Sequence, residues 1–326
     1  MSPRFKVDLA TKLGPLELKN PVLVSSGTFG YGGEYAEFYD PSSLGGIVTK
    51  SITLDERPGN PPPRLVETPS GLINSIGLQN VGVDRFISEK LPVLREIGTV
   101  RIVNIAGSTI REYVAVAKKL EGLDGFDAFE LNISCPNVKA GGIAFGTSPS
   151  SAGRLTAAVR KATVRPLIVK LSPNVADILP VARAAVDAGA DVLSLVNTYR
   201  AMAIDVESRR PALGAVTGGL SGPAIRPLAI YHVFRLSLNL GAPLIGMGGI
   251  QCGRDALEFI LAGAHAVSIG TASFIDPTAP MRALGEIRDY CVRRRVRSVS
   301  GLIGAAHRGR PQGKRLNSPS LLNHEP

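Results

Sequence analysis

The chain has 326 residues, of which 44% are hydrophobic and 20% are charged, a composition that is ordinary for a folded soluble protein and sufficient for one large core. Its apolar runs are shorter than the roughly 18 to 20 residues of a membrane span, and the N-terminus lacks a signal-peptide pattern, so we expect a cytoplasmic protein without a membrane segment. The three cysteines, Cys135, Cys252 and Cys291, are too few for a disulfide framework and lack the short spacing of a metal site.

The formal net charge of +10 is concentrated near the C-terminus. From Tyr290 onward the chain carries a net charge of +7, which leaves +3 for everything before it. Positive and negative charges are nearly balanced before Tyr290, and the excess of positive charge lies at the C-terminus. This distribution is more typical of a solvated helix end and a disordered tail than of a nucleic-acid site. We therefore expect one folded domain over residues 1–307, a disordered basic tail over residues 308–326, and no nucleic-acid partner.

Eight short runs rich in Val, Ile and Leu recur along the chain, each followed by turn residues. In chain order they are Pro21–Ser26, Gly46–Lys50, Arg101–Ile105, Ala128–Ser134, Pro166–Leu171, Asp191–Asn197, Pro243–Gly248 and Ala266–Gly270. Continuous apolar content without strict alternation is typical of strands that are covered on both faces. The pattern therefore predicts eight parallel strands.

Segments with helical spacing of apolar residues lie between and after these runs. They are Val83–Ile97, Arg111–Leu120, Ser150–Thr163, Val175–Ala188, Ala224–Leu240, Arg254–Ala262 and Thr278–Arg294. Strands and helices that alternate in this way close most simply as a single (β/α)8 TIM barrel. A doubly wound open sheet is the alternative, but its first turn should carry a G-x-G-x-x-G fingerprint, and Ser25–Gly30 lacks that spacing.

Three loops stand out by length or composition. Ser51–Gly82 and Thr198–Pro223 are too long to be simple turns, and the glycine-rich Cys135–Pro149 follows the fourth predicted strand. Long loops after barrel strands usually carry function, and a glycine-rich loop over a barrel mouth is a candidate lid. We therefore expect long loops over the C-terminal mouth of the barrel.

Polar residues recur at the predicted C-terminal ends of the strands, where barrel enzymes build their sites. They are Ser26, Lys50, Asn104, Asn132, Ser134, Lys170, Asn197 and Thr198. Lysines and asparagines in buried strands are costly unless each finds a hydrogen-bonding partner. A single core polar group is commonly satisfied by its neighbours, but a whole ring of them predicts a bound polar ligand.

The last two predicted strands end in the glycine-rich turns Gly246–Ile250 and Gly270–Ala272. Small residues let backbone N–H groups approach an anion, and barrels frequently bind phosphate after strands seven and eight. A phosphate there, with Lys50 and Lys170 at the same mouth, fits a flavin cofactor and an anionic substrate. It also fits a phosphosugar lyase or isomerase in which Lys170 forms a Schiff base.

The segment Asn132-Ile133-Ser134-Cys135-Pro136-Asn137 closely resembles the dihydroorotate dehydrogenases, and the similarity extends from about Val7 to Gly304. Further motifs match in order: Ser25–Gly30, Thr49-Lys50-Ser51, Asn74–Asn80, Val169–Asn174, Val196-Asn197-Thr198, Gly218–Pro223 and Gly246–Ile250. A cysteine at the position of the base, Cys135, is a feature in which the chain resembles the class 1 enzymes. The segment Tyr199–Asp205 resembles the NAD-linked 1B branch. The chain differs from the family at Ala272-Ser273-Phe274, where Ala-Asn-Phe is expected, and in its basic tail.

This resemblance implies an enzyme of pyrimidine biosynthesis that oxidises dihydroorotate to orotate, with Cys135 taking the proton from C5 while hydride passes from C6 to FMN. The implied FMN contacts are Ser26, Lys50, Ser51, Asn104, Asn132, Lys170, Val196, Gly222, Gly248, Gly249, Gly270 and Thr271. The implied substrate contacts are Lys50, Asn74, Ser75, Ile76, Gly77, Leu78, Asn132, Asn197 and Thr198. Cys252 and Cys291 are expected to be small structural residues.

The resemblance also implies a partner subunit that carries FAD and a [2Fe–2S] cluster and passes electrons to NAD, in a heterotetramer built on a homodimer of this chain. The three cysteines of this chain cannot supply the four ligands of such a cluster, so it must lie elsewhere. Two alternatives remain open. One is a related FMN barrel acting on another dihydropyrimidine, and the other is a phosphate-binding barrel without catalytic activity.

Overall fold

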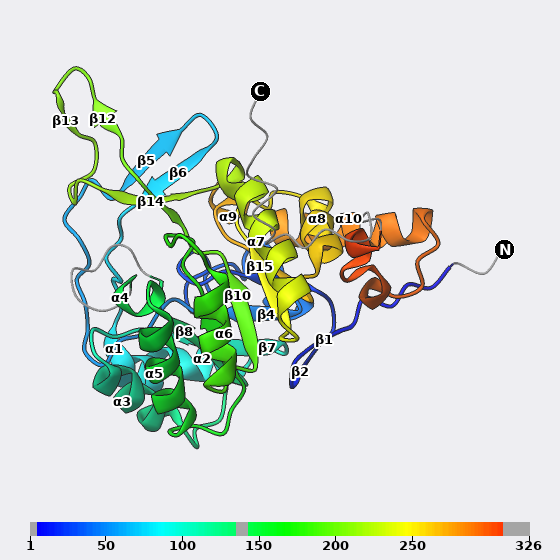
Figure 1. Ribbon diagram of the computed structural model, residues 1–326, viewed down its shortest axis with the longest axis horizontal. Coiled ribbons are helices and arrows are strands. Elements are labelled where there is room, and N and C mark those ends of the chain that lie inside the picture. The colour runs from blue at the N-terminus through cyan, green and yellow to red at the C-terminus, as the bar shows by residue number, and fades with distance from the viewer. Residues whose placement is uncertain (1–4, 135–142, 309–326) are drawn as a thin grey trace.

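A computed structural model describes residues 5–134 and 143–308 of the chain. Eight parallel strands close into a barrel, as predicted (Figure 1). In chain order the barrel strands are β3 (Val22–Val24), β4 (Gly46–Val48), β7 (Val100–Ile105), β8 (Ala128–Asn132), β9 (Leu167–Lys170), β10 (Val192–Leu195), β15 (Leu244–Met247) and β16 (Ala266–Ile269). Each coincides with one of the eight predicted runs to within two residues at either end, and β16 pairs with β3 to close the ring.

Helices surround the barrel, and most follow the predicted segments. The α-helices are α1 (Gly82–Arg85), α2 (Leu91–Arg95), α3 (Ile110–Leu120), α4 (Ile143–Gly146), α5 (Pro149–Arg160), α6 (Leu179–Asp187), α7 (Arg226–Asn239), α8 (Gly253–Ala262), α9 (Ala272–Ile275) and α10 (Ala279–Arg293). Shorter turns are η1 (Pro41–Ser43), the π-helical η2 (Phe86–Lys90), η3 (Pro223–Ile225), η4 (Val299–Leu302) and η5 (Ala305–His307). Within the described part of the chain, none of these helices is long and apolar enough to cross a membrane.

Helix α6 starts four residues later than its apolar spacing predicts. The prediction placed the start at Val175, whereas α6 begins at Leu179. The side chain of Asp177 accepts the N–H of Leu179 at 2.9 Å, a local bond that competes with helical geometry in the preceding turn. Pro180 then occupies the first turn, where its missing N–H costs nothing.

The N-terminal end of the barrel is closed by a hairpin that the sequence did not suggest. Strands β1 (Thr11–Leu13) and β2 (Leu16–Leu18) pair antiparallel, and their leucines join the apolar cluster inside the barrel. That cluster includes Ala128 and Val192, the first residues of their strands. The apolar half of the interior therefore lies at this end, and polar side chains are left to the opposite, C-terminal end.

The two long connections, expected to be loops, form one sheet with each other. The first supplies β5 (Leu65–Thr68) and β6 (Gly71–Asn74), and the second supplies β11 (Tyr199–Ala201) and β14 (Gly218–Ser221). The antiparallel order is β11-β14-β6-β5, so segments about half the chain apart are held together. The second connection also carries a small exposed hairpin of β12 (Ile204–Asp205) and β13 (Arg210–Pro211). Figure 1 shows β5, β6 and β14 on the side of the barrel away from β1 and β2.

Candidate functional site

A cavity of about 750 Å³ lies at the C-terminal mouth of the barrel. It is bounded by the ends of barrel strands, by the turns after β15 and β16, and by the sheet of β5, β6 and β14. The predicted site residues that line it are Ser26, Lys50, Ser51, Asn74, Ile76, Gly77, Leu78, Asn132, Lys170, Val196, Asn197, Thr198, Gly222, Gly248, Gly249, Gly270 and Thr271. The volume falls in the range of about 300 to 1,000 Å³ that is usual for ligand pockets.

Of the predicted FMN and substrate contacts that the structure describes, Asn104 and Ser75 do not line this cavity. Asn104 is fully buried behind Ser51, whose hydroxyl donates to the Asn104 side-chain oxygen at 2.5 Å. The hydroxyl of Ser75 accepts a hydrogen bond from the Asn60 side chain at 2.9 Å on the other side of the loop. Both residues therefore support neighbours that do face the cavity, which the sequence alone did not distinguish.

Two lysines bring positive charge to the cavity. Lys170 is 4% exposed, and its ammonium donates to the Ser26 hydroxyl at 3.2 Å. Burial lowers the pKa of Lys50, while the Glu34 carboxylate raises it and the Arg64 guanidinium lowers it again. A half-buried ammonium with a lowered pKa gains when an anionic ligand arrives, because the ligand replaces the lost solvation. The pair therefore favours an anionic ligand.

The glycine turns allow close approach of backbone to a ligand. Gly248 and Gly249 follow β15 with φ of +119° and +77°, and Gly222 has φ of +91°, all in the left-handed region. A Cβ on Gly249 would lie 2.7 Å from the carbonyl oxygen of Gly222. Across from them, the Thr271 hydroxyl donates to the Ser221 hydroxyl at 2.8 Å. The turns after β15 and β16 thus meet the end of β14 at one corner of the cavity.

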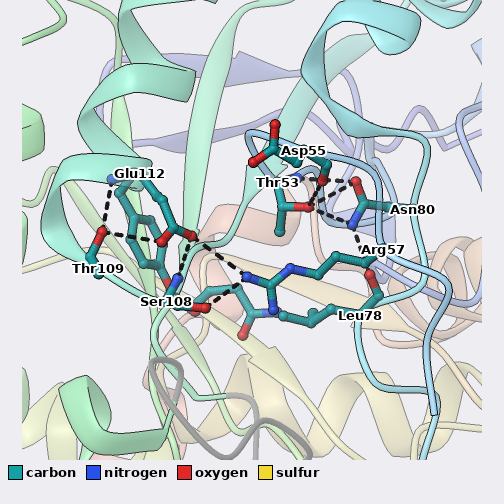
Figure 2. A network of polar contacts seen from close by, with 10 residues as sticks. Thr53, Asp55, Arg57, Leu78, Asn80, Ser108, Thr109 and Glu112 are labelled. Atoms are coloured by element: carbon teal, nitrogen blue, oxygen red, sulfur yellow. Dashed lines mark hydrogen bonds and ion pairs between the residues drawn. The ribbon is translucent and has the colours of Figure 1, made fainter.

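The segment from Asn74 to Leu78 forms another wall, and Leu78 adopts a φ of +57°. Asn74 pairs with Gly219 of β14, to whose carbonyl its side chain donates at 3.1 Å. Just beyond the segment, Asn80 donates to the carbonyl of Leu78 at 2.7 Å and accepts the N–H of Thr53 at 3.1 Å (Figure 2). The wall is therefore anchored at both ends.

A second part of the same network ties this wall to the neighbouring strand connection. Figure 2 shows Arg57 reaching Ser108 and Glu112, which follow β7. Arg57 donates to the Ser108 hydroxyl at 2.7 Å and lies 3.5 Å from the Glu112 carboxylate. The backbones of Arg57 and Asn80 also exchange two hydrogen bonds. The loop after β4 is consequently fixed against the loop after β7.

Several residues at the cavity were not predicted from the sequence. Those that line it include Glu67, Thr68, Ser70, Gln79, Ser221, Ser268, Phe274 and Ile275. Half of them, Glu67, Thr68, Ser70 and Ser221, belong to the β5–β6–β14 sheet or adjoin it, and no local pattern indicated that sheet. Glu130 was also not predicted as a site residue, but it does not line the cavity, because it is fully buried behind the cavity wall. An acidic residue two positions before Asn132 in an apolar strand was the available signal, since residues i and i+2 share a face.

Cys135, the predicted base, lies outside the described residues, as do most of the predicted lid and of the tail. Asn132 and Ser134, which immediately precede it, are buried. Cys291 is buried, which raises the pKa of its thiol, and Cys252 is half-buried. Across residues 5–134 and 143–308, no group of three or more His, Cys, Asp or Glu side chains could hold a metal ion.

The fold and the cavity define a (β/α)8 barrel protein whose C-terminal mouth holds a cavity lined by two lysines, asparagine side chains and glycine turns. Residues 8–290 match the family model described as dihydroorotate dehydrogenase, and the chain belongs to that family. It is 53% identical over 298 residues to a protein of Citrifermentans bemidjiense, covering 91% of this chain and 98% of the relative. It is 54% identical over 301 residues to one of Pelobacter propionicus, covering 92% and 99%. Both relatives are named dihydroorotate dehydrogenase B (NAD(+)), catalytic subunit.

A solved structure shares the architecture at lower identity. The crystal structure of a DHODH from Eimeria tenella in complex with ferulenol matches with a TM-score of 0.79 and 24% identity. The match covers 94% of this chain and 91% of that chain. At that identity the likeness concerns the fold, and it agrees with the closed barrel described above.

Proposed function

We propose that this chain oxidises (S)-dihydroorotate to orotate with bound FMN, in the synthesis of pyrimidines. The observation that carries the proposal is that one cavity combines two lysines, amide side chains and glycine turns suited to a phosphate. Family membership and the names of the relatives support the same activity. Each feature alone also occurs in barrels of unrelated activity, but together they fit a phosphorylated cofactor next to a small anionic substrate.

The residues around the cavity fit FMN as a cofactor. Gly222, Gly248, Gly249, Gly270 and Thr271 would hold the phosphate, because backbone N–H groups can approach it where no Cβ intervenes. Ser26, Ser51, Lys170 and Val196 would contact the rest of the cofactor, and Lys170 would place a positive charge beside the flavin ring. Bound FMN would supply the two-electron acceptor for the hydride that leaves C6.

The substrate would be held by the other wall of the cavity. Dihydroorotate presents a carboxylate and two amide-like edges, and asparagine carries a donor and an acceptor on one side chain. Asn74, Asn132, Asn197 and Thr198 line the cavity and would bind these edges. Lys50 would pair with the carboxylate, which explains why a half-buried lysine with a lowered pKa is retained there.

Cys135 would act as the base. Its thiolate would take the proton from C5 as C6 loses a hydrogen with its electron pair, so that a C5–C6 double bond forms. The role rests on the resemblance of Asn132–Asn137 to the family and on thiol chemistry, because a thiol titrates closer to neutrality than a serine hydroxyl. In the sequence, Cys135 directly follows Ser134 and lies three positions after Asn132, the last residue of β8, which supports its assignment to this site.

The electrons would leave through a separate cytoplasmic partner subunit that carries FAD and a [2Fe–2S] cluster and reduces NAD. The word "subunit" and the acceptor NAD(+) in the names of the relatives support this arrangement. Two copies of this chain and two of the partner would form the complex.

The experiment is an anaerobic titration of the purified chain, followed by the bleaching of flavin absorbance. Dihydroorotate should bleach one FMN per chain, whereas dihydrouracil, which lacks the carboxylate, should not. Mass spectrometry of the extracted flavin should give FMN without FAD. Equal flavin reduction by both compounds would mean that the natural substrate is another dihydropyrimidine. If the purified chain binds no flavin, only the alternative of a phosphate-binding barrel without catalytic activity remains.

A further inference from the structure

A fully buried carboxylate lies inside the barrel just behind the cavity wall. Glu130 of β8 has no exposed surface. One of its oxygens accepts the side-chain N–H of Asn104 at 2.5 Å, and the other accepts the hydroxyl of Ser194 at 2.7 Å. Both oxygens are therefore held by side chains of the two strands β7 and β10, and neither reaches the cavity.

From Glu130 a line of side-chain hydrogen bonds leads to the cavity. The Asn104 side-chain oxygen accepts from the Ser51 hydroxyl at 2.5 Å, and the Ser51 oxygen accepts from the amide of Asn132 at 3.1 Å. Ser51 and Asn132 both line the cavity. The buried carboxylate is thus connected to the cavity wall through a single intervening residue, Asn104.

The line continues across the mouth of the barrel. The Asn132 side-chain oxygen accepts from the Ser134 hydroxyl at 3.2 Å, and the Ser134 oxygen accepts from the amide of Asn197 at 2.7 Å. The Asn197 side-chain oxygen accepts the backbone N–H of Thr198 at 2.9 Å. One continuous series of side-chain hydrogen bonds therefore runs from Glu130 to Asn197. Its members lie on β7 and β8 or just after β4, β8 and β10.

The two ends of this series impose a direction on it. Both oxygens of Glu130 accept hydrogen bonds, which fixes one end, and a backbone N–H, which can only donate, fixes the other. Each amide and hydroxyl between them can do either, so their orientation follows from the ends and from the backbone N–H of Ser134, which donates to the Asn132 side-chain oxygen at 3.4 Å. With Glu130 accepting, Asn104 must donate to it, Ser51 must donate to Asn104, and the amides of Asn132 and Asn197 must each commit one N–H to the series.

We propose that Glu130 is a positioning residue that sets which atom the side-chain amide of Asn132 presents to the substrate. Each committed amide nitrogen has a second hydrogen, so Asn132 and Asn197 offer N–H donors to acceptor oxygens of the ligand. Without an acceptor at Glu130, Asn104 can turn over and Ser51 can donate to Asn132. Asn132 can then turn its oxygen to the cavity, which gives up only the long hydrogen bond of 3.4 Å from the Ser134 backbone N–H. That oxygen would face the carbonyl and carboxylate oxygens of the substrate and repel them.

The ligand in this inference is the one of the proposed function, so the test separates the two. Three variants of the FMN-loaded chain are compared for orotate binding by calorimetry and for flavin reduction by dihydroorotate in stopped flow. Glu130→Met removes the acceptor at similar length. Glu130→Gln keeps an acceptor oxygen for Asn104, because its amide nitrogen can donate to Ser194 instead. Ser194→Ala is the matched control, since it removes the other contact of Glu130 and leaves Asn104 untouched.

For Glu130→Met we expect retained FMN and an orotate dissociation constant raised at least about tenfold, which corresponds to about 1.4 kcal/mol. The half-saturating dihydroorotate concentration should rise in parallel, while Glu130→Gln and Ser194→Ala stay near the wild type. An unchanged dissociation constant in Glu130→Met would overturn the inference. So would Glu130→Gln binding as poorly as Glu130→Met, because the charge rather than the acceptor would then matter.

If Glu130→Met fails to fold or to hold FMN, neutron diffraction of the wild-type chain decides. The deuteron on the Ser51 oxygen should point to Asn104, and that on the Ser134 oxygen to Asn132. A Ser51 deuteron that points to Asn132 would overturn the inference. If the wild-type chain does not bind orotate, the proposed function fails, and the deuteron positions still test the role of Glu130.

Discussion

Replacement of Gly249 by alanine tests whether the FMN phosphate binds where Gly222, Gly249 and Thr271 meet at one corner of the cavity. Gly249 has φ of +77°, a conformation that costs an L-residue roughly 1–2 kcal/mol. The added Cβ would lie 2.7 Å from the carbonyl oxygen of Gly222 and 2.8 Å from the Cβ of Arg226, so the backbone must move. Such overpacking typically costs about 1–3 kcal/mol, and we therefore expect the free energy of unfolding to fall by about 2–5 kcal/mol.

The same displacement should weaken FMN binding. A hydrogen bond from a backbone N–H to a charged group contributes about 1.5–3 kcal/mol, so the loss of one such bond to the phosphate lowers FMN affinity by about tenfold to a hundredfold. The assay is titration of the flavin-free chain with FMN, followed by quenching of flavin fluorescence, together with thermal unfolding of the flavin-free chain.

Two other glycines provide matched controls. Gly122 has φ of +81° but nothing within 4 Å of its added Cβ, so Gly122→Ala isolates the cost of the backbone conformation. It should lose about 1–2 kcal/mol of stability and keep its FMN affinity. Gly285 lies within α10 with open space around it, and Gly285→Ala should stabilise the chain by about 0.5–1 kcal/mol. If Gly249→Ala binds FMN as tightly as Gly122→Ala does, the phosphate does not lie at this corner.

Three further predictions concern the chemistry. The Cys135→Ser variant should keep its FMN, but its flavin reduction at pH 7 should be slower by at least about a hundredfold and should become faster toward high pH. If stopped flow shows flavin bleaching at a near wild-type rate, Cys135 is not the base. Burial lowers the pKa of Lys50, and only its ammonium form pairs with the carboxylate of orotate. Orotate binding should therefore weaken as the pH rises through that lowered pKa, by at most about tenfold per pH unit. Calorimetry from neutral pH up to 10.5, the ordinary value for a lysine ammonium, should find this slope absent in Lys50→Met. An equal slope there would assign the titration to another group. The isolated chain should reduce NAD poorly until a partner subunit is added, and rapid NAD reduction by a preparation without iron would contradict the two-subunit arrangement.

The barrel could be predicted because its signals are local. A strand such as Ala128–Asn132 is buried on both faces, so its apolar run is visible without knowledge of its neighbours. The glycines after β15 are visible for a similar reason, since a left-handed conformation favours glycine whatever the surroundings. The start of α6 was misplaced because the side chain of Asp177 caps a turn within an otherwise helical pattern.

The sequence by itself determined the eight strands, the order of the site residues along the chain and the ends of the strands at which they lie. Only the tertiary structure decided that β6 pairs with β14, which gives the cavity its outer wall from two distant segments. Only the tertiary structure separated Ser51, which faces the cavity, from Asn104 and Glu130, which stand behind it. The reason is physical: backbone preference and apolar periodicity act within a few residues, whereas pairing between distant segments and the direction of a hydrogen-bond series depend on which side chains barrel closure brings together.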